Sequence, residues 1–180
     1  MVASVLVVCR ANQGRSPVAA ELLRLHAARM GAAVHVSSSG LDALPGMPML
    51  PAMNKAWHHR GHGAFDHVSR GFDPIEARAA ELTLVFEAAQ RSRIVNELPS
   101  LVGRVYTVRE ATRLIGSPRW NPAWSGSSSV MTRLHRLRGY VEPADDDTPD
   151  PARMRRSACQ RLLVELERSA ELIGNALFTR

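Results

Sequence analysis

A thiol and a guanidinium lie six positions apart near the start of the chain, in the stretch CRANQGRSP, which begins at Cys9 and has Arg15 as its seventh residue. The aliphatic run before Cys9 predicts a buried strand, whereas Ser16 and Pro17 are typical of a helix N-terminus. The stretch is therefore predicted to be a loop between a strand and a helix. In such a loop the backbone N–H groups of residues 10–15 can converge, and the helix adds its positive end, so we expect a binding site for a phosphate dianion.

Several residues of this loop have types that suit phosphate chemistry. Gly14 permits close approach, and Asn12 tolerates a left-handed backbone and can brace the loop through its side chain. Arg15 can hold two phosphate oxygens with its planar fork. The same positive field favours the thiolate of Cys9, which would then lie in line to attack a bound phosphoryl group. Reading Cys9 as a buried strand residue and Arg15 as a surface charge does not account for the whole string.

A phosphatase of this kind also needs a carboxylic acid to protonate the leaving oxygen. The stretch DDDTPDPARM offers four candidates, Asp145, Asp146, Asp147 and Asp150, just before the last predicted helix. Pro151 stiffens the turn after Asp150 and can present that side chain. An Asp-rich loop is more often solvated or caps a helix, so the residues alone leave the choice open.

The chain of 180 residues predicts a single α/β domain, because strand-like and helix-like patterns alternate along it. We expect a four-stranded parallel sheet with helices on both faces. Segment 116–149 is rich in Pro, Ser, Gly and Asp and forms an irregular insertion before the last helix, with a short helix over 130–138. The predicted strands are 4–9, 34–37, 82–86 and 102–108, and the predicted helices are 17–30, 48–60, 87–98, 109–115 and 152–177.

The composition limits the cellular compartment and the classes of partner that we expect for the protein. The two cysteines, Cys9 and Cys159, are too few for a disulfide framework, so a reducing cytoplasm is expected. No apolar run approaches the roughly 18 residues of a spanning helix, and no charged segment precedes the first strand, so neither membrane insertion nor a signal peptide is expected. The net charge is +6, but the arginines are scattered among acids, which favours an anionic substrate over nucleic acid.

These residues resemble the bacterial-type low-molecular-weight protein tyrosine phosphatases, whose signature is Cys-x5-Arg-Ser close to the N-terminus. The similarity extends through Ser38 in VSSSGL, HVSR at 67–70, LTLVFE before the third helix, and the pair Asp150-Pro151. It covers nearly the whole chain, with 116–149 as the poorly matching part. The resemblance implies a hydrolase that removes phosphate from phosphotyrosine in proteins through a phosphocysteine intermediate, without a metal or cofactor.

The resemblance also implies a role for each matching residue. Cys9 would be the nucleophile, Arg15 the phosphate clamp and Asp150 the general acid and later the base. Ser16 would hydrogen-bond the thiolate and favour it as a leaving group, and Asn12, Ser38 and His67 would hold the loop in shape. The loop that binds phosphate, whether of a phosphoprotein or as a free oxyanion, would comprise Arg10, Ala11, Asn12, Gln13, Gly14, Arg15 and Ser16.

The departures from the family pattern all concern the substrate. Members that favour phosphotyrosine wall the pocket with aromatics, whereas the matching positions here are Leu44 and Ala152-Arg153. One hypothesis is that Trp120 and Trp124, in the insertion, fold over the site and take their place.

Two positions within the loop also differ. Gln13 fits neither the threonine of related phosphoarginine phosphatases nor the aliphatic residue of tyrosine phosphatases, and Gly14 replaces a second cysteine found in many relatives. The choice between phosphotyrosine and phosphoarginine therefore stays open.

Three rival functions remain open beside a tyrosine phosphatase. The first is a protein arginine phosphatase of the same fold, and the second is an arsenate reductase, for which Cys159 is the only other thiol. The third is a non-catalytic module that binds phosphate. His58 and His62 share the spacing of some zinc ligands, but no third ligand is evident, so we expect a solvated histidine cluster and no metal site. The sequence does not indicate an oligomeric state.

Overall fold

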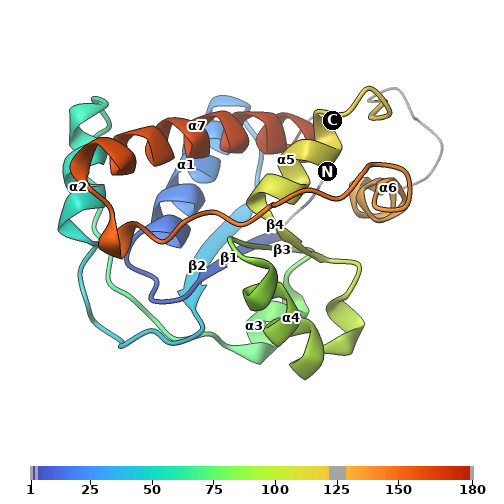
Figure 1. Cartoon of the computed structure of the whole chain (residues 1–180), viewed down its shortest axis with the longest axis horizontal. Helices are drawn as coiled ribbons and strands as arrows, with labels where there is room; N and C mark the ends of the chain where they lie inside the picture. Colours follow the sequence, from blue (N-terminus) through green and yellow to red (C-terminus); the bar gives the residue numbers. More distant parts are fainter. Residues whose placement is uncertain (1, 3, 122–128, 179–180) are drawn as a thin grey trace.

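The computed structural model describes residues 2, 4–121 and 129–178. Its centre is a sheet of four parallel strands in the order β2-β1-β3-β4 (Figure 1). The strands are β1 (Ser4–Cys9), β2 (His35–Gly40), β3 (Leu82–Val85) and β4 (Val105–Thr107). This is the α/β fold predicted from the sequence, and β1 lies in its interior with Cys9 as its last residue.

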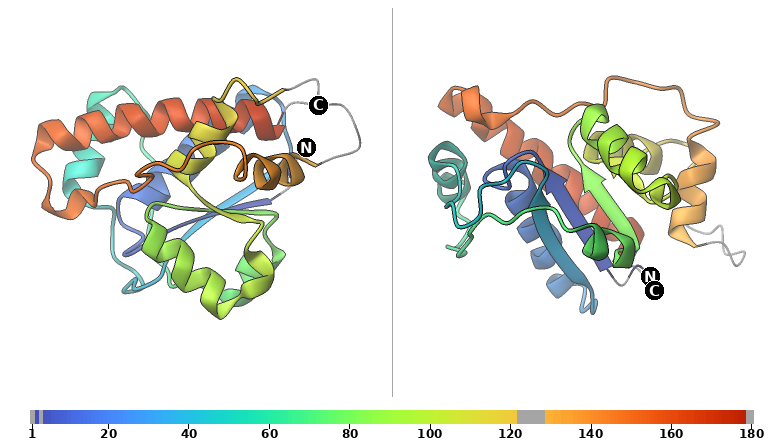
Figure 2. Two further views of the ribbon diagram at one scale, coloured as in Figure 1. Left: turned by 45° about the vertical axis from the view of Figure 1, so that its right-hand side comes forward. Right: turned by 90° about the horizontal axis from the view of Figure 1, so that it is seen from below.

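Helices cover both faces of the sheet. The hydrophobic clusters and the two views in Figure 2 place α1, α2, α5 and α7 on one face, and α3 and α4 on the other. Within the described residues no helix is both long enough and apolar enough to cross a membrane. The helices are α1 (Arg15–Arg29), α2 (Pro51–His59), α3 (Pro74–Ala79), α4 (Ala88–Glu97), α5 (Val108–Ile115), α6 (Val130–Leu137) and α7 (Arg156–Phe178).

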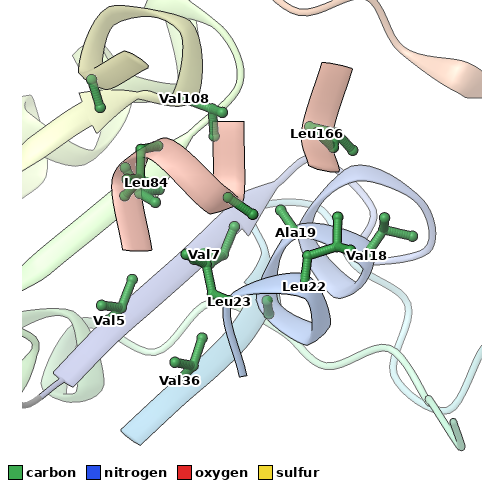
Figure 3. Packing of buried hydrophobic residues seen from close by; sticks show 14 of the residues in the cluster. Val5, Val7, Val18, Ala19, Leu22, Leu23, Val36, Leu84, Val108 and Leu166 are labelled. Atoms are coloured by element: carbon green, nitrogen blue, oxygen red, sulfur yellow. The ribbon is translucent and has the colours of Figure 1, made fainter. Parts of the chain in front are cut away.

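The alternating side chains of β1 enter two separate cores. Val5 and Val7 pack with the helices of the α1 and α7 face, where Figure 3 shows Leu23 beside them. Leu6 and Val8 pack against the α3 and α4 face. A strand that is buried on both sides needs apolar residues at successive positions, which explains the unbroken aliphatic run before Cys9.

The structure differs from the predicted elements where a capping residue sets the boundary. Predicted strand 102–108 is shortened to β4 at both ends. Residues 102–104 form a turn after the 3-10 helix Pro99–Leu101, and Thr107 accepts a hydrogen bond from the Glu110 backbone and starts α5 in a capping box. Helix α3 was not predicted; Asp73 caps it by accepting from Ile75 N at 2.8 Å. Predicted helix 152–177 is divided into a short 3-10 turn, Pro151–Arg153, and α7, and Asp150 caps the turn.

The insertion 116–149 contains the predicted short helix, α6. Trp120 lies beside this helix, since the Arg133 guanidinium carbon is 5.2 Å from its ring centroid. Figure 1 places α6 and the chain before the grey trace at the opposite end of the sheet from the loop between β1 and α1. The structure therefore does not place Trp120 over that loop, contrary to the hypothesis above, and Trp124 lies outside the described residues.

Candidate active site

The loop between β1 and α1 surrounds the Cys9 thiol with hydrogen-bond donors. Cys9 Sγ lies 3.0 Å from Ser16 Oγ and accepts the Asn12 backbone N–H at 3.3 Å. Both bonds are buried, and α1 begins at Arg15, so its positive end faces the same loop. Donors of this kind stabilise negative charge on sulfur and favour the thiolate.

Asn12 connects the loop to two other segments. It is the one non-glycine residue among those described that has a left-handed backbone, with φ of 53°. Its Nδ2 donates to Ser16 Oγ at 2.9 Å and to Ser38 Oγ at 3.0 Å, and its Oδ1 accepts from Arg70 N at 3.0 Å. Its carbonyl oxygen lies 2.6 Å from His67 Nε2. The predicted supporting residues therefore lie together around a fully buried amide, with the Arg70 backbone as a partner that sequence reasoning missed.

His67 serves this network as a neutral donor. Burial lowers the pKa of its ring, the hydrogen bond to Asn12 opposes that effect, and the positive charges of Arg24 and Arg70 lower the pKa further. A carbonyl oxygen can only accept, so the proton of the neutral ring must lie on Nε2. The loop therefore keeps its support at neutral pH.

Two glycines let other parts of the chain approach the loop. A Cβ on Gly40 would lie 2.7 Å from both Arg10 O and Asn12 N, so only glycine fits at the end of β2. A Cβ on Gly14 would lie 2.9 Å from Pro151 Cγ. Gly14 therefore also lets the segment that carries Asp150 approach the loop, a contact that was not predicted. Gly40 was missed, although its place at the end of a serine-rich strand was a usable signal.

Arg15 lies almost fully buried beneath the site, with 2% of its side chain exposed. Its Nη1 donates to Glu87 Oε1 at 2.5 Å and to the Thr148 carbonyl at 2.6 Å. Its Nη2 lies 3.5 Å from Asp150 Oδ2. Glu87 and Thr148 were not foreseen, because their relation to Arg15 arises only when β3 and the chain before α7 come together.

Asp150 faces the loop, where Arg10 and a backbone N–H contact its carboxylate. Arg10 donates to its Oδ2 from Nε at 3.2 Å and from Nη2 at 3.0 Å, and the Ala152 N–H donates to its Oδ1 at 3.0 Å. Partial burial raises the pKa of this carboxyl, but the Ala152 hydrogen bond and the charges of Arg15 and Arg10 outweigh burial. The pKa therefore lies below its ordinary value.

The other three candidate acids are held in structural contacts. Asp146 Oδ2 lies 2.6 Å from Arg113 Nη2, and Asp147 Oδ1 accepts from Ala88 N at 2.6 Å at the start of α4. Asp145 Oδ1 accepts from Asp147 N at 3.1 Å. Of the four, Asp150 is the one that the structure brings to Arg10 and Arg15.

The positions at which the family pattern has aromatics carry exposed side chains without rings. The Leu50 N–H donates to the Gln13 carbonyl at 2.6 Å, so the chain before α2 follows the loop. Leu44, on this stretch, is 72% exposed, and Ala152 and Arg153 after Asp150 are also exposed. The Leu44, Ala152 and Arg153 side chains offer no ring on which a phosphotyrosine could stack.

The histidine cluster after α2 has a different environment from the one expected. His62 is only partly exposed, its Nε2 lies 2.7 Å from Glu167 Oε1, and its ring stacks on Trp57 with centroids 4.1 Å apart. The expectation that it is solvated is therefore wrong for His62. Among the residues that the structure describes, no group of three His, Cys, Asp or Glu side chains could hold a metal ion.

Comparison with known proteins places the chain among phosphatases. Residues 4–117 match the family model described as low molecular weight phosphotyrosine protein phosphatase. Over 110 residues, 61% of this chain and 73% of the relative, the chain is 33% identical to a probable low molecular weight protein-tyrosine-phosphatase of Ralstonia nicotianae. Over 106 residues, 59% of this chain and 70% of the relative, it is 29% identical to the protein-arginine-phosphatase of Bacillus subtilis.

Solved structures share the fold. A mutant of YwlE from Bacillus subtilis superposes with a TM-score of 0.72 and 22% identity, covering 96% of this chain and 97% of that one. The tyrosine phosphatase Wzb from Escherichia coli K30, in complex with sulphate, gives a TM-score of 0.70 and 22% identity over 97% of this chain and 98% of its own. The family model ends at residue 117, so Asp150 lies beyond the matched residues.

Proposed function

This chain belongs to the low molecular weight phosphotyrosine protein phosphatase family, and we propose that it hydrolyses phosphotyrosine in proteins through a phosphocysteine intermediate. The observation that carries the proposal is the convergence of three groups on one loop. These groups are the Cys9 thiol with its two donors, the buried Arg15 guanidinium and the Asp150 carboxyl. The loop N–H groups and Arg15 hold the phosphate, and no metal or cofactor enters the proposed steps.

In the first step Cys9 Sγ attacks phosphorus. A sulfur–phosphorus bond forms, the bond from phosphorus to the ester oxygen breaks, and that oxygen takes a proton from Asp150. A positioned acid of this kind contributes about 10²–10⁴-fold to the rate. Arg15 and the loop N–H groups stabilise the charge on the three equatorial oxygens.

Asp150 must gain a proton before the first step, because the charges of Arg15 and Arg10 favour its ionised form. A phosphate group beside it has the opposite effect, since its negative charge raises the pKa of the carboxyl and draws Arg15 to its own oxygens. A phosphate monoester has its second ionisation near pH 6, so about that pH it can bring the proton with it.

In the second step Asp150, now a carboxylate, takes a proton from water. The water oxygen attacks phosphorus, the sulfur–phosphorus bond breaks, and inorganic phosphate leaves. Ser16 Oγ, 3.0 Å from Cys9 Sγ, can donate to the departing thiolate and make it a better leaving group. The cycle requires a free thiol, and the reducing cytoplasm is the compartment we propose for the protein.

A second candidate is hydrolysis of phosphoarginine. Leu44, Ala152 and Arg153 stand at the positions where the family pattern has aromatics, and one curated relative is named a protein-arginine-phosphatase. The same Cys9 and Arg15 would act on a phosphorus–nitrogen bond. Arsenate reduction has less support, because Cys159 is fully buried and packs beneath Pro151, with 4.0 Å from its Sγ to the Pro151 carbonyl.

The test is steady-state hydrolysis of phosphotyrosine, phosphoserine and phosphoarginine peptides with EDTA present. We expect wild type to act on phosphotyrosine, Cys9→Ser to be inactive, and Asp150→Asn to lose about 10²–10⁴-fold in kcat. Asp73→Asn is the matched control and should keep kcat, because Asp73 caps α3 on the other face of the sheet.

Other outcomes separate the rivals. Preference for phosphoarginine would change the substrate and keep the mechanism. Phosphate binding with no hydrolysis of any peptide would leave the non-catalytic module, and full activity in Cys9→Ser would refute the phosphocysteine route.

A further inference from the structure

The side chain of Arg10 has a place at the site that the proposed mechanism does not use. Its backbone belongs to the phosphate loop, but its guanidinium lies at the rim, where 58% of the side chain is exposed. Both Nε and Nη2 donate to one oxygen, Oδ2 of Asp150. The two oxygens of that carboxylate are thereby occupied, since the Ala152 N–H already donates to Oδ1.

Arg10 can exchange Asp150 for another anion at little cost in free energy. Exposed pairs gain little net free energy, because water competes for both partners and long side chains lose freedom. Arg15, in contrast, is buried and bound to Glu87 and Thr148, so the anion that it can reach is the phosphate in the loop. Arg10 is the guanidinium at this site that can leave Asp150 for an anion outside the loop.

The charges around Arg10 favour binding of a further carboxylate. Arg153, three residues after Asp150, is exposed and adds a second positive charge to the segment that carries the acid. Asp42, whose N–H donates to the Arg10 carbonyl at 2.8 Å, is neutralised by Arg93 at 2.6 Å. Glu87, the other nearby acid, is bound to Arg15. A carboxylate brought by a substrate would therefore meet uncompensated positive charge at the rim once Asp150 turns to the phosphate.

We propose that Arg10 is a specificity-determining residue that binds an acidic side chain next to the phosphorylated residue of the substrate. The inference rests on the proposed phosphatase function and deepens it by naming a substrate class, phosphoproteins with acidic residues flanking the phosphorylated one. An Arg fork suits a carboxylate, because two N–H groups can meet its two oxygens.

Binding of such a substrate also prepares the acid. The substrate carboxylate replaces Oδ2 of Asp150 as the acceptor for Arg10, while the Ala152 N–H stays on Oδ1. Oδ2 is then free to take the proton of the phosphate monoanion and to pass it to the leaving oxygen. A substrate whose flanking residues are neutral leaves Arg10 bound to Asp150. It gains neither the contact with Arg10 nor the release of Oδ2.

The test compares two phosphotyrosine peptides that differ only in having Glu or Gln on both sides of the phosphorylated residue. For wild type we expect kcat/KM to be about three- to tenfold higher with the Glu peptide at low salt. The ratio should shrink in 0.5 M NaCl, because ions screen an exposed pair. Should phosphoarginine be the better substrate, the same pair is made with phosphoarginine.

Variants assign the preference to one side chain. Arg10→Gln should bring the ratio to about one, Arg10→Lys should keep part of it, and Arg168→Gln, which removes an exposed arginine on α7, should leave it unchanged. A wild-type ratio of one, or a preference that survives in Arg10→Gln, overturns the inference while the phosphatase stands. No turnover of either peptide overturns the proposed function and the inference with it. Where Arg10→Gln damages the loop, two other results overturn the inference. One is a kcat/KM ratio of one for Arg10→Lys, and the other is a wild-type ratio that does not change with salt.

Discussion

At the scale of single residues, the loop depends on side chains that are small enough or short enough for crowded positions. Asn12 combines a left-handed backbone with an amide that reaches Ser16, Ser38 and the Arg70 backbone. Asparagine tolerates this conformation better than most residues, which is why the sequence predicted both the turn and the bracing role. Its partners from distant segments came from the resemblance, because spacing along the chain does not reveal which strands meet.

Gly14 provides the sharpest test of how the loop positions the acid. In Gly14→Ala the new Cβ would lie 2.9 Å from Pro151 Cγ, so the rigid ring and the adjoining Asp150 must move. We expect kcat to fall about tenfold or more, since small misplacements of a reacting group are costly. Inhibition by inorganic phosphate should change little, because the loop N–H groups remain. The same contact explains why the second cysteine of many relatives would not fit here without a shift of Pro151.

The control for this variant is Gly139→Ala, where the nearest atom to a new Cβ is 3.6 Å away. It should leave kcat unchanged. Equal losses of turnover and phosphate affinity in Gly14→Ala would mean that the loop itself is distorted, and would contradict a selective effect on Asp150.

At the scale of elements, the irregular chain before Asp150 is held by arginines of α5. Arg113 pairs with Asp146 at 2.6 Å and donates to the Glu142 carbonyl at 2.7 Å, while Arg109 binds Glu165 and the Asp147 carbonyl. Thr148 N donates to Phe86 O at 2.7 Å and ties the same chain to the end of β3. A segment without helix or strand thus delivers the acid to a defined place.

Arg113→Met should therefore affect catalysis from a distance. The variant keeps the apolar stem but loses the ion pair and the carbonyl bond, so we expect the free energy of unfolding to fall by about 1–2 kcal/mol. We also expect kcat to fall several-fold with little change in KM, because Asp150 is positioned less well and the phosphate loop is intact. Urea unfolding and steady-state kinetics measure the two effects.

Arg60→Met is the matched control, because Arg60 also makes a two-bond contact with a carboxylate, Glu167, at 3.2 and 2.7 Å. That pair joins α2 to α7 and not the chain before Asp150. Its loss should lower stability without changing kcat. An unchanged kcat in Arg113→Met would show that α5 does not position the acid.

The sequence predicted the buried strand correctly, but it missed the short helical elements that begin at a capping residue. Predicted strand 4–9 coincides with β1, because burial on both faces demands an unbroken apolar run. Helix α3 has six residues, too few to display a periodic pattern, and only Asp73 and Pro74 marked its start. The 3-10 turn after Asp150 escaped prediction because the chain from Ala152 onward is helical in character and its break at Met154 depends on tertiary contacts.

At the scale of the whole molecule, much of the arginine excess is used inside the fold. Arg15, Arg109, Arg113 and Arg138 each pair with a carboxylate and with backbone carbonyls. These four pairs account for part of the scattered pattern of arginines and acids in the sequence. The sequence predicted that the basic charge is not a nucleic-acid surface, but could not assign partners that are distant along the chain.

The stability of the whole molecule at high pH depends on Tyr106 of β4, which is buried in the core. Its hydroxyl donates to Gly103 O at 3.0 Å, and the Arg138 guanidinium carbon lies 3.8 Å from its ring centroid. Burial raises its pKa to about 12; the charge of Arg138 opposes this shift. In the unfolded chain the pKa is about 10, so between pH 10 and 12 the unfolded state releases a proton that the folded state keeps. Folding stability is therefore full below about pH 10 and falls by on the order of 2 kcal/mol as the pH rises to about 12.

Tyr106→Phe separates this effect from general alkaline damage. The variant loses the hydrogen bond to Gly103 and should be somewhat less stable at pH 7, but its free energy of unfolding should fall less steeply between pH 10 and 12. Cys159, whose pKa burial also raises, adds a loss of the same sign that begins at lower pH and persists in the variant. Urea unfolding at a series of pH values measures the two slopes. Equal slopes for wild type and variant would mean that Tyr106 ionises as readily in the folded core as in the unfolded chain, and would contradict its burial as the cause.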